Sequence, residues 1–241
     1  MELTYDLHIH SCLSPCADDD MTPNNIVGLA RLLKLDLIAV TDHNTVKNAV
    51  AAYEVGLEQG LMVLPGMELE TAEEVHVVCL FPDPKKAVAF EKEIALLSPP
   101  VKNRPEIFGR QILMDRNDLV LGEEDRLLLT ATRLSVDAVS AAVKVFQGAA
   151  FPAHIDRPSF SMLANLGDIP DSSGFTAVEI SKIASLEDLE RRFPAVGRFL
   201  VLRNSDAHRL TDISVLGNKL LVPEFSPEAV IHRLNEVKRR E

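Results

Sequence analysis

The amino-acid sequence predicts an α/β fold in which a parallel sheet closes into a barrel. Short apolar runs with the character of buried strands alternate along the chain with longer segments of helical periodicity. This alternation favours parallel strands joined by crossover helices. Six of the seven histidines lie in or just after the apolar runs. A closed barrel would bring these positions to one mouth, whereas an open sheet would spread them apart.

Seven apolar runs are expected to be strands, because they are rich in β-branched residues and are bounded by polar or turn residues. They cover residues 3–9, 35–40, 62–67, 75–81, 149–154, 177–180 and 199–202. The first helix is expected to begin at Thr22 and Pro23, a hydroxyl N-cap followed by proline at the first helical position. Gly60 is suited to end a second helix over 46–59. Further helices are expected over 84–97, 135–146, 185–192 and 226–240.

The whole chain, residues 1–241, is expected to form one domain, since barrels of this length often fold as a single unit. A composition of 46% hydrophobic and 25% charged residues suits a globular protein with a full core. The stretch 98–132 has prolines at 99, 100 and 105 and mixed charge. We interpret it as an insertion or lid that carries some helix.

The formal net charge of −11 argues against long nucleic acid as a partner, because that binding depends on Lys and Arg neutralising phosphates. It is compatible with a small phosphorylated substrate, since bound cations can make a pocket locally positive. The N-terminus has no basic leader with an apolar core, and no apolar run approaches the length of a bilayer span. A cytoplasmic protein with no membrane partner is therefore expected, and the sequence does not indicate its oligomeric state.

The three cysteines, Cys12, Cys16 and Cys79, form no paired framework. We interpret them as reduced thiols, as is usual in cytoplasmic proteins. Cys12 and Cys16 lie near the first histidine motif but lack zinc-site spacing, so they are not expected to bind metal.

Histidines mark the ends of the expected strands. His8 and His10 flank Ile9 at the end of the first strand, where alternation points both imidazoles to the same face. His232 lies on the last helix, away from any strand end, and is given no role. The remaining histidines are His43, His154 and His208, which follow strands, and His76, which comes early in its strand.

Carboxylates accompany these histidines. Glu68 ends the third strand and could bridge two cations, with Glu70 as an alternative of the same strand parity. Asp206 shares a turn with His208, and one residue of the acidic run 18–20 is expected to be a further ligand. Asp6 and Asp42 are expected to orient imidazoles. Imidazole mixed with carboxylate suits zinc, iron or manganese better than calcium or magnesium, so the pattern predicts a metal centre.

Together these motifs resemble the polymerase and histidinol phosphatase (PHP) family. The resemblance implies a distorted (β/α)7 barrel, similar to a TIM barrel, that holds up to three divalent cations (Mn, Fe or Zn). The matching segments run in family order: Asp6-Leu7-His8-Ile9-His10-Ser11, Thr41-Asp42-His43-Asn44, Gly66-Met67-Glu68 with His76, Ala153-His154, and Asn204-Ser205-Asp206-Ala207-His208.

The same resemblance implies which residues hold each cation. The first would be bound by His8, His10, Glu68 and Asp206, and the second by Glu68, His76 and His154. The third would take His43, His208 and one acidic residue. Asp18 is preferred as that acid, and Asp20 is its competitor.

The expected activity is hydrolysis of a phosphate monoester, in which a hydroxide bridging two cations attacks phosphorus in line. Asp206 or His208 would relay a proton to the leaving group. Arg157, which follows the His154 strand, would hold the phosphate, unless it forms an ion pair with Asp156 or another acid. Weaker candidates for the rest of the substrate are Arg209, Lys102, Arg104 and Arg110.

The chain looks most similar to stand-alone PHP phosphoesterases, which implies a nucleotide substrate: a nucleoside 3′,5′-bisphosphate or the 5′ end of a short RNA. In that branch an inserted segment helps to bind the base, a role that would fall to 98–132. Histidinol-phosphate phosphatase is the second interpretation and protein-tyrosine phosphatase the third. Related metal-dependent amidohydrolases also begin with His-x-His, but they typically add a lysine at a strand end and finish with a strand-end aspartate. Here no lysine occupies such a strand end and the last motif is Asp-x-His, so amide hydrolysis is disfavoured. Outside the enzymes, a metal-binding regulatory module is the alternative, and the complete ligand set argues against it.

Overall fold

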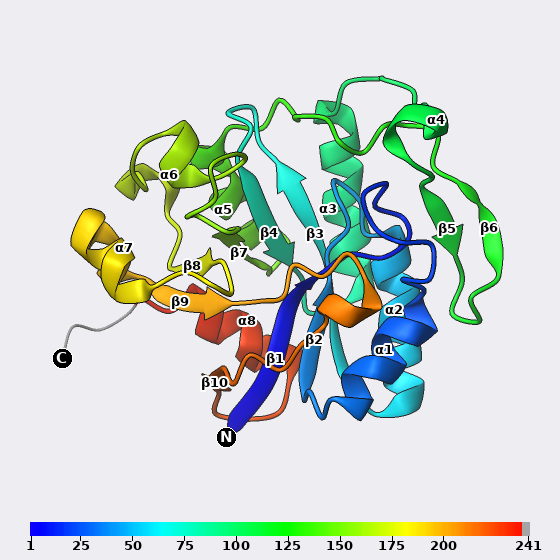
Figure 1. Ribbon diagram of the computed structural model, residues 1–241, viewed down its shortest axis with the longest axis horizontal. Coiled ribbons are helices and arrows are strands. Elements are labelled where there is room, and N and C mark those ends of the chain that lie inside the picture. The colour runs from blue at the N-terminus through cyan, green and yellow to red at the C-terminus, as the bar shows by residue number, and fades with distance from the viewer. Residues whose placement is uncertain (238–241) are drawn as a thin grey trace.

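The structure, a computed structural model, describes residues 1–237 and contains a curled six-stranded sheet with a two-stranded sheet beside it (Figure 1). Three consecutive strands of the larger sheet run parallel, and the others are antiparallel to their neighbours. The strand order is β10-β1-β2-β3-β4-β7. The bounds are β1 Glu2–Ile9, β2 Leu37–Val40, β3 Met62–Glu70, β4 His76–Leu80, β7 Ala149–Pro152 and β10 Lys219–Leu221.

The smaller sheet closes the ring between β7 and β1. It pairs β8 (Ala177–Ile180) with β9 (Leu200–Arg203) in parallel. Ile155 N, just after β7, donates to the carbonyl oxygen of Glu179 in β8 at 2.9 Å. His10 N, just after β1, donates to the carbonyl oxygen of Ala207 beyond β9, also at 2.9 Å. These backbone hydrogen bonds, one at each junction, replace continuous strand pairing. The seven expected strands therefore form a barrel that is distorted, as predicted.

The expectation of an all-parallel sheet is wrong at β4, which runs antiparallel to both β3 and β7. Only residues 71–75 connect β3 to β4, with Thr71 N bonded to Val75 O at 2.9 Å. A parallel crossover needs a dozen or more residues, so a short turn forces the chain to reverse. As a result His76, at the start of β4, lies at the same rim as the ends of β3 and β7. Its early position in the strand is thereby explained.

The helices begin close to where the sequence places them. Thr22 caps α1 by accepting a hydrogen bond from Asn25 N, and Gly60 ends α2 with φ of 72°. The last helix was expected to reach 240 but ends at Asn235; residues 238–240 lie outside the described part of the chain. Glu236 has extended backbone, with ψ of 130°, which ends the helix, and Val237 is 75% exposed. The bounds are α1 Pro23–Leu32, α2 Lys47–Gln59, α3 Pro84–Leu97, α5 Val136–Val145, α6 Met162–Asn165, α7 Leu186–Arg192 and α8 Pro227–Asn235.

The core has two layers, one inside the curled sheet and one outside it. Along β2, Leu37 and Ala39 belong to the inner cluster, which α8 covers, and Ile38 and Val40 belong to the outer cluster beneath α1 and α2 (Figure 1). In β1 the alternation is interrupted by a register shift between Asp6 and Ile9. Leu7 therefore faces inward and Ile9 outward. His8 and His10 lie where this change of face occurs.

The predicted insertion, 98–132, contains the short helix α4 (Pro105–Phe108) and a hairpin of β5 (Ile112–Met114) and β6 (Val120–Glu123) that lies beside α2 in Figure 1. The hairpin was not predicted. Ile112 N donates to Cys12 O at 3.0 Å, so the insertion is attached to the loop that follows β1. Its role as a lid remains a prediction.

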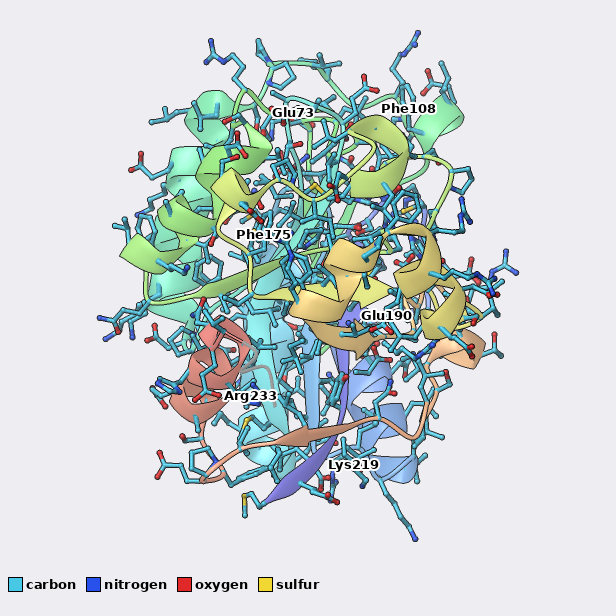
Figure 2. The ribbon with its side chains drawn as sticks, turned by 90° about the vertical axis from the view of Figure 1, so that its left-hand side faces the viewer. Glu73, Phe108, Phe175, Glu190, Lys219 and Arg233 are labelled. Atoms are coloured by element: carbon cyan, nitrogen blue, oxygen red, sulfur yellow. The ribbon has the colours of Figure 1, made fainter. Side chains whose placement is uncertain are left out.

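Figure 2 shows the two ends of the molecule from another side. Glu73, after β3, and Phe108, in the insertion, lie at one end, and Lys219 of β10 and Arg233 of α8 lie toward the other. The histidine rim belongs to the first of these ends. Among the helices of residues 1–237, none combines the length and apolar composition needed to span a bilayer.

Candidate metal centre

Glu68, near the end of β3, stands at the centre of the predicted histidine cluster. It is only 1% exposed, so its charge must be balanced by protein groups or by bound cations. Five imidazoles place a ring nitrogen beside its carboxylate. Oε1 lies 3.0 Å from His76 Nδ1, 3.2 Å from His154 Nε2 and 3.3 Å from His8 Nε2, and Oε2 lies 3.2 Å from His10 Nε2 and from His43 Nδ1.

The side chains of His8 and His10 meet at a second carboxylate, that of Asp206. Their Nε2 atoms are 3.2 Å apart and lie 3.3 and 3.2 Å from Asp206 Oδ1. His8 Nδ1 contacts the carboxylate of Glu179 at 3.0 Å, and a carboxylate only accepts, so Nδ1 carries the ring hydrogen. In a neutral His8 the lone pair is then on Nε2, facing those carboxylates.

His10 is oriented in the same way through Ser14. Ser14 Oγ donates to Asp42 Oδ1 at 2.7 Å, so it accepts from His10 Nδ1 at 2.9 Å. Asp42 also accepts from Ser11 N and Oγ, at 2.8 and 2.6 Å. The expectation that Asp42 orients an imidazole is met through Ser14, and the imidazole is that of His10.

Lone pairs of two imidazoles and two carboxylates therefore converge on one region, an arrangement that repels unless positive charge fills it. Such convergence, with each ring's other nitrogen fixed by an oxygen, is characteristic of metal-ligating histidines. In addition, Nδ1 of His154 is buried with no hydrogen-bond partner in residues 1–237. Buried polar atoms without a partner are rare in proteins, and this one lies on the opposite side of the ring from Nε2, which faces Glu68 at 3.2 Å. The side chains fit divalent cations of the zinc, manganese and iron type.

The pKa values of the buried imidazoles and carboxylates show that this region favours positive charge. Burial alone lowers the pKa of His8, but the carboxylates of Glu179, Asp206 and Glu68 raise it well above its usual value. Burial also opposes protonation of His10, yet hydrogen bonds to Asp206 and Glu68 raise its pKa to about 9. Burial raises the pKa of Glu68 and Asp206, and the surrounding imidazoles outweigh this and hold both far below their usual range. Both carboxylates therefore remain charged.

The imidazoles nearer the mouth respond in the opposite direction. Burial lowers the pKa of His43 well below its usual value, and the attraction of Glu68 does not compensate. Burial and the neighbouring charge of His10 lower the pKa of His208 to about 4. Both rings are therefore neutral near pH 7, as metal ligands must be.

Glu179 of β8 is part of the site, although the sequence motifs do not include it. It is 1% exposed and accepts hydrogen bonds from Asn204 Nδ2 at 2.6 Å and from His154 N at 3.0 Å, besides its contact with His8. One signal was available: a glutamate stands within the apolar run Ala177–Ile180. A buried carboxylate needs partners, and here the partner is a metal-ligand histidine.

Asp6 was expected to orient an imidazole, and its carboxylate instead contacts backbone. Its Oδ1 accepts from Ser205 N at 3.0 Å and, at 3.5 Å, from His8 N. Burial raises the pKa of Asp6 to about 6. Asp6 thus fixes the turn that presents Asp206, whose φ is 49°. His154 also has a positive φ, 29°, and such backbone strain in residues other than glycine is concentrated at functional sites.

The predicted catalytic residues lie together at the mouth. Arg157 Nη2 donates to Asp206 Oδ2 at 2.6 Å, and Asp156 instead accepts from Ser181 N at 2.7 Å. Arg157 is 43% exposed, so one side of its guanidinium is open to a substrate. His208 Nδ1 lies 2.9 Å from the backbone oxygen of Asp206, and its ring stacks on that of His10 with centroids 4.2 Å apart.

Asp18 lies beside the cluster, and its carboxylate is turned to another partner. Oδ2 of Asp18 is 3.6 Å from Arg209 Nε, and the side chain is 53% exposed. Cys16 instead has its Sγ 3.4 Å from His43 Nε2. The ligand atoms of Cys16, His10, His43 and His208 lie within 4.8 Å of one another. Cysteine spacing along the chain could not reveal this contact, because its partners come from distant strands.

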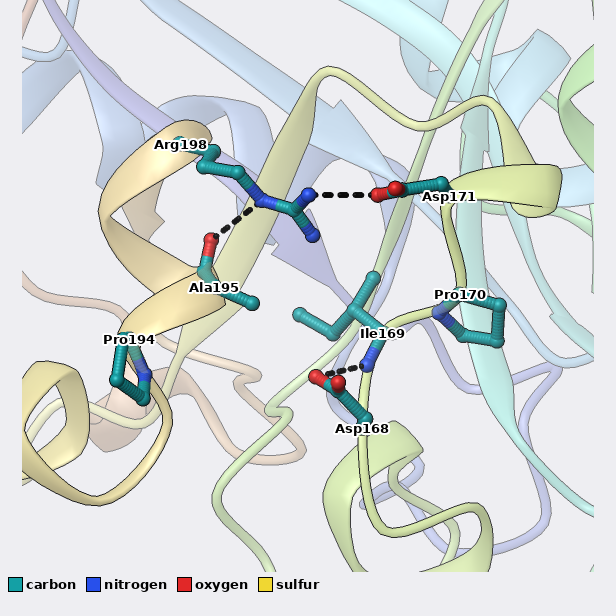
Figure 3. A pocket seen from close by; sticks show the side chains of 7 residues that line it. All are labelled: Asp168, Ile169, Pro170, Asp171, Pro194, Ala195 and Arg198. Carbon is teal, nitrogen blue, oxygen red and sulfur yellow. Dashed lines mark hydrogen bonds and ion pairs between the residues drawn. The ribbon is translucent and has the colours of Figure 1, made fainter.

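Other features lie outside this centre. His232 pairs with Glu236 at 3.3 Å on α8, and Arg110 pairs with Glu123 and Asp19. A separate surface hollow of about 460 Å³ is shown in Figure 3. Arg198 lines this hollow, and its guanidinium is already paired with Asp171 at 2.7 Å and donates to Ala195 O at 3.3 Å. The hollow shares no lining residue with the metal centre.

Comparison with known proteins links these residues to a family. A model of the PHP domain matches residues 6–156, more than half of the chain. Among curated proteins, an uncharacterized protein of Methanocaldococcus jannaschii is 32% identical over 98 residues, covering 37% of this chain and 57% of that protein. The 5′-3′ exoribonuclease Rnm of Salmonella typhimurium is 36% identical over 81 residues, covering 32% of this chain and 27% of Rnm. The chain thus spans less than two thirds of either relative.

Solved structures share the fold over most of the chain. The lesion-specific endonuclease PfuEndoQ from Pyrococcus furiosus matches with a TM-score of 0.72 and 20% identity, over 98% of this chain and 56% of that one. A protein from Bifidobacterium adolescentis described as a metal-dependent phosphoesterase matches with a TM-score of 0.60 and 20% identity, over 95% and 94%. These structures confirm the predicted barrel class.

One further structure bears on the expected partners. An endonuclease Q complex with a 27-mer duplex that carries an abasic lesion at its active site matches with a TM-score of 0.60 and 19% identity, over 87% of this chain and 50% of that one. A protein of this fold therefore does hold long nucleic acid, and the expectation that this chain avoids it is not confirmed. The predicted family is confirmed by the matching domain model and by ligand motifs that meet in space: the chain belongs to the PHP-domain family.

Proposed function

We propose that this chain is a metal-dependent phosphoesterase that hydrolyses a terminal phosphate of a nucleotide or of a short RNA. The observation that carries the proposal is the convergence of imidazole and carboxylate lone pairs from His8, His10, Glu68 and Asp206. Bound divalent cations would activate water at neutral pH and neutralise the oxygens of a phosphate, which is what ester hydrolysis requires.

Up to three cations fit the arrangement of the side chains. The deepest would be held by the four residues just named. A second would be held by Glu68, His76 and His154, and His76 Nδ1 and His154 Nε2 lie 3.0 and 3.2 Å from Glu68 Oε1. A third would be held toward the mouth by His43 and His208. The mixture of nitrogen and oxygen ligands favours manganese, iron or zinc.

The protein's own groups would bind the phosphate and move protons. Arg157 would hold a phosphate oxygen with the part of its guanidinium that Asp206 leaves open. Asp206 and His208 have lowered pKa values, so both are in the basic form in the metal-free protein. They remain the candidates to pass a proton to the leaving oxygen, and His208 could do so only while its Nε2 does not hold a cation.

An aromatic side chain favours a nucleotide over other phosphate esters. Phe160 stacks on His76 with centroids 4.8 Å apart and is 42% exposed, so it offers a ring face beside the second cation position. Stacking on aromatic side chains is a general way of binding bases. The net charge of −11 favours a small or short substrate over a long duplex.

A substrate panel tests the proposal. Manganese-loaded protein would be assayed with a nucleoside 3′,5′-bisphosphate, a 5′-phosphorylated short RNA, histidinol phosphate, a phosphotyrosine peptide and a duplex with an abasic lesion. Turnover is expected to be fastest with the first two. Preference for histidinol phosphate or the peptide would replace the nucleotide assignment, and preference for the duplex would indicate an endonuclease. If no ester is hydrolysed although metal analysis finds bound cations, the chain is a metal-binding module.

A further inference from the structure

We propose that Cys16 is a ligand of the outermost cation, so that this position is a sulfur-containing, zinc-preferring site formed by Cys16, His43 and His208. The inference rests on the proposed function only in requiring that the chain binds cations. Its basis is geometric: Cys16 Sγ lies 3.4 Å from His43 Nε2, in a group of four ligand atoms within 4.8 Å of one another. The fourth member, His10, is already directed at Glu68 and Asp206.

The hydrogen bonds of the two imidazoles leave the correct nitrogen free. His43 Nδ1 contacts Glu68 Oε2 at 3.2 Å, and His208 Nδ1 contacts the backbone oxygen of Asp206 at 2.9 Å. Both partners are acceptors, so in each neutral ring the hydrogen is on Nδ1 and the lone pair is on Nε2. In His43 it is Nε2 that faces Cys16. Two ring lone pairs and one thiol therefore meet at the mouth of the centre.

The loop that carries Cys16 also keeps Asp18 away from this position. Asp18 N donates to His208 O at 2.9 Å and Met21 N donates to Asp18 O at 3.0 Å, which fixes the backbone of Asp18 beside the cluster. Its carboxylate is half-exposed and pairs with Arg209. For Asp18 to replace Cys16, this ion pair and the local turn would have to rearrange.

The insertion supports the same loop from outside. Gly109 has φ of 99°, and a Cβ placed there would come within 2.2 Å of Pro15 O, so only glycine allows this close approach. Pro15 directly precedes Cys16. The contact holds the thiol at the mouth and gives the segment 98–132 a part in building the metal centre.

The chemical consequence is a difference between the cation positions of one site. Thiolate with two imidazoles is a donor set typical of zinc, and it leaves a fourth position open to water or substrate. The deeper positions have only nitrogen and oxygen donors, which also suit manganese and iron. When zinc and manganese are supplied together, zinc is therefore expected to occupy the outer position preferentially.

Cobalt substitution tests this without reference to activity. The Co²⁺-loaded wild-type chain is expected to show the near-ultraviolet charge-transfer band of a cobalt–thiolate bond. The Cys16→Ser variant should lose the band and bind one cation fewer per chain, and Cys16→Asp should regain the cation without the band. Cys12→Ser is the matched control, because Cys12 lies in the same loop but faces Ile112 and Asn48. Asp18→Ala should retain both the band and the cation.

The outcomes separate this inference from the proposed function. If Cys16→Ser retains the band and the full cation content, or if Asp18→Ala loses the outer cation while Cys16→Ser does not, Cys16 is not a ligand. If the wild-type chain binds no cation at all, the proposed function fails as well. Circular dichroism and retention of the deeper cations by Cys16→Ser would show that the variant is folded.

Discussion

The deep and outer halves of the metal centre are built differently. In the deep half, His8 and His10 are fully buried, and each has its second nitrogen fixed by a buried oxygen, from Glu179 or from Ser14. In the outer half, His208 is 28% exposed and Arg157 43% exposed, and Cys16 lies on a surface loop. Rigid, fully partnered ligands are expected to hold metal tightly. Exposed ones are expected to decide which metal and which substrate are accepted.

The largest effect should come from the carboxylate that both deep cation positions share. Glu68→Gln keeps the shape of the side chain and removes the charge that five imidazoles surround. Activity should fall by more than about 100-fold, beyond the loss typical of groups that only support a ligand. Metal analysis should show weaker binding of both deep cations. Glu70→Gln is the control. Equal cation content in the two variants would show that Glu68 is not the ligand that the deep positions share.

A smaller effect is expected from the partner of His8. Glu179→Gln should weaken metal affinity by about 10–100-fold, because the His8 ring loses the acceptor that fixes its tautomer. Titration of the chelator-treated protein with zinc would measure this loss. The exposed Glu187 supplies a matched control, as Glu187→Gln lies nearby in sequence and contacts no ligand histidine. Unchanged affinity in Glu179→Gln would mean that the deep half does not depend on its buried partners.

Removal of the exposed guanidinium should affect substrate more than metal. Arg157→Ala is expected to lower kcat/KM by about tenfold, as for loss of one charge-assisted hydrogen bond, with cation content unchanged. Arg157→Lys should recover part of the loss, since lysine keeps the charge without the planar fork. A drop in cation content in Arg157→Ala would assign the arginine to the metal centre itself, through Asp206.

An effect of a different kind, on the stability of the metal-free chain, concerns His10. Its pKa is about 9 in the folded protein, above the ordinary value, so protonation stabilises the fold. This contribution is complete below about pH 6.5 and is lost as pH rises through 9, at a cost on the order of 3 kcal/mol. Thermal unfolding at pH 6.5 and 9 should show the loss only after chelation. Equal stability of the chelated protein at both values would contradict the assignment.

The sequence predicted the deep half more completely than the outer half, for physical reasons. Strand alternation and strand ends suffice to bring His8, His10 and Glu68 together, because they depend on local periodicity. The contribution of Cys16 depends on a loop conformation that hydrogen bonds to His208 and contacts with the insertion impose. Such contacts between distant segments leave no periodic trace in the sequence.

The fold follows the same division. The seven strands were predicted from apolar runs, yet the reversal of β4 was not, because an apolar run has no direction. The strand β10 was also missed: only Leu220 of its three residues is buried, so it lacks an apolar pattern. Glu179 was missed as well, although an acidic residue inside a buried strand was a signal that it needs a partner.

The hydrogen bonds between the start of the chain and residues beyond 200 have a consequence for the order of folding. Leu7 N donates to Asn204 Oδ1, and Asp6 Oδ1 accepts from Ser205 N, across separations of 197 and 199 residues. Contacts this distant form slowly, since a long loop must close before they give any stability. His8 and His10 can therefore meet Asp206 only after residues 204–206 have packed against β1. Completion of the deepest cation position is expected to follow this long-range closure.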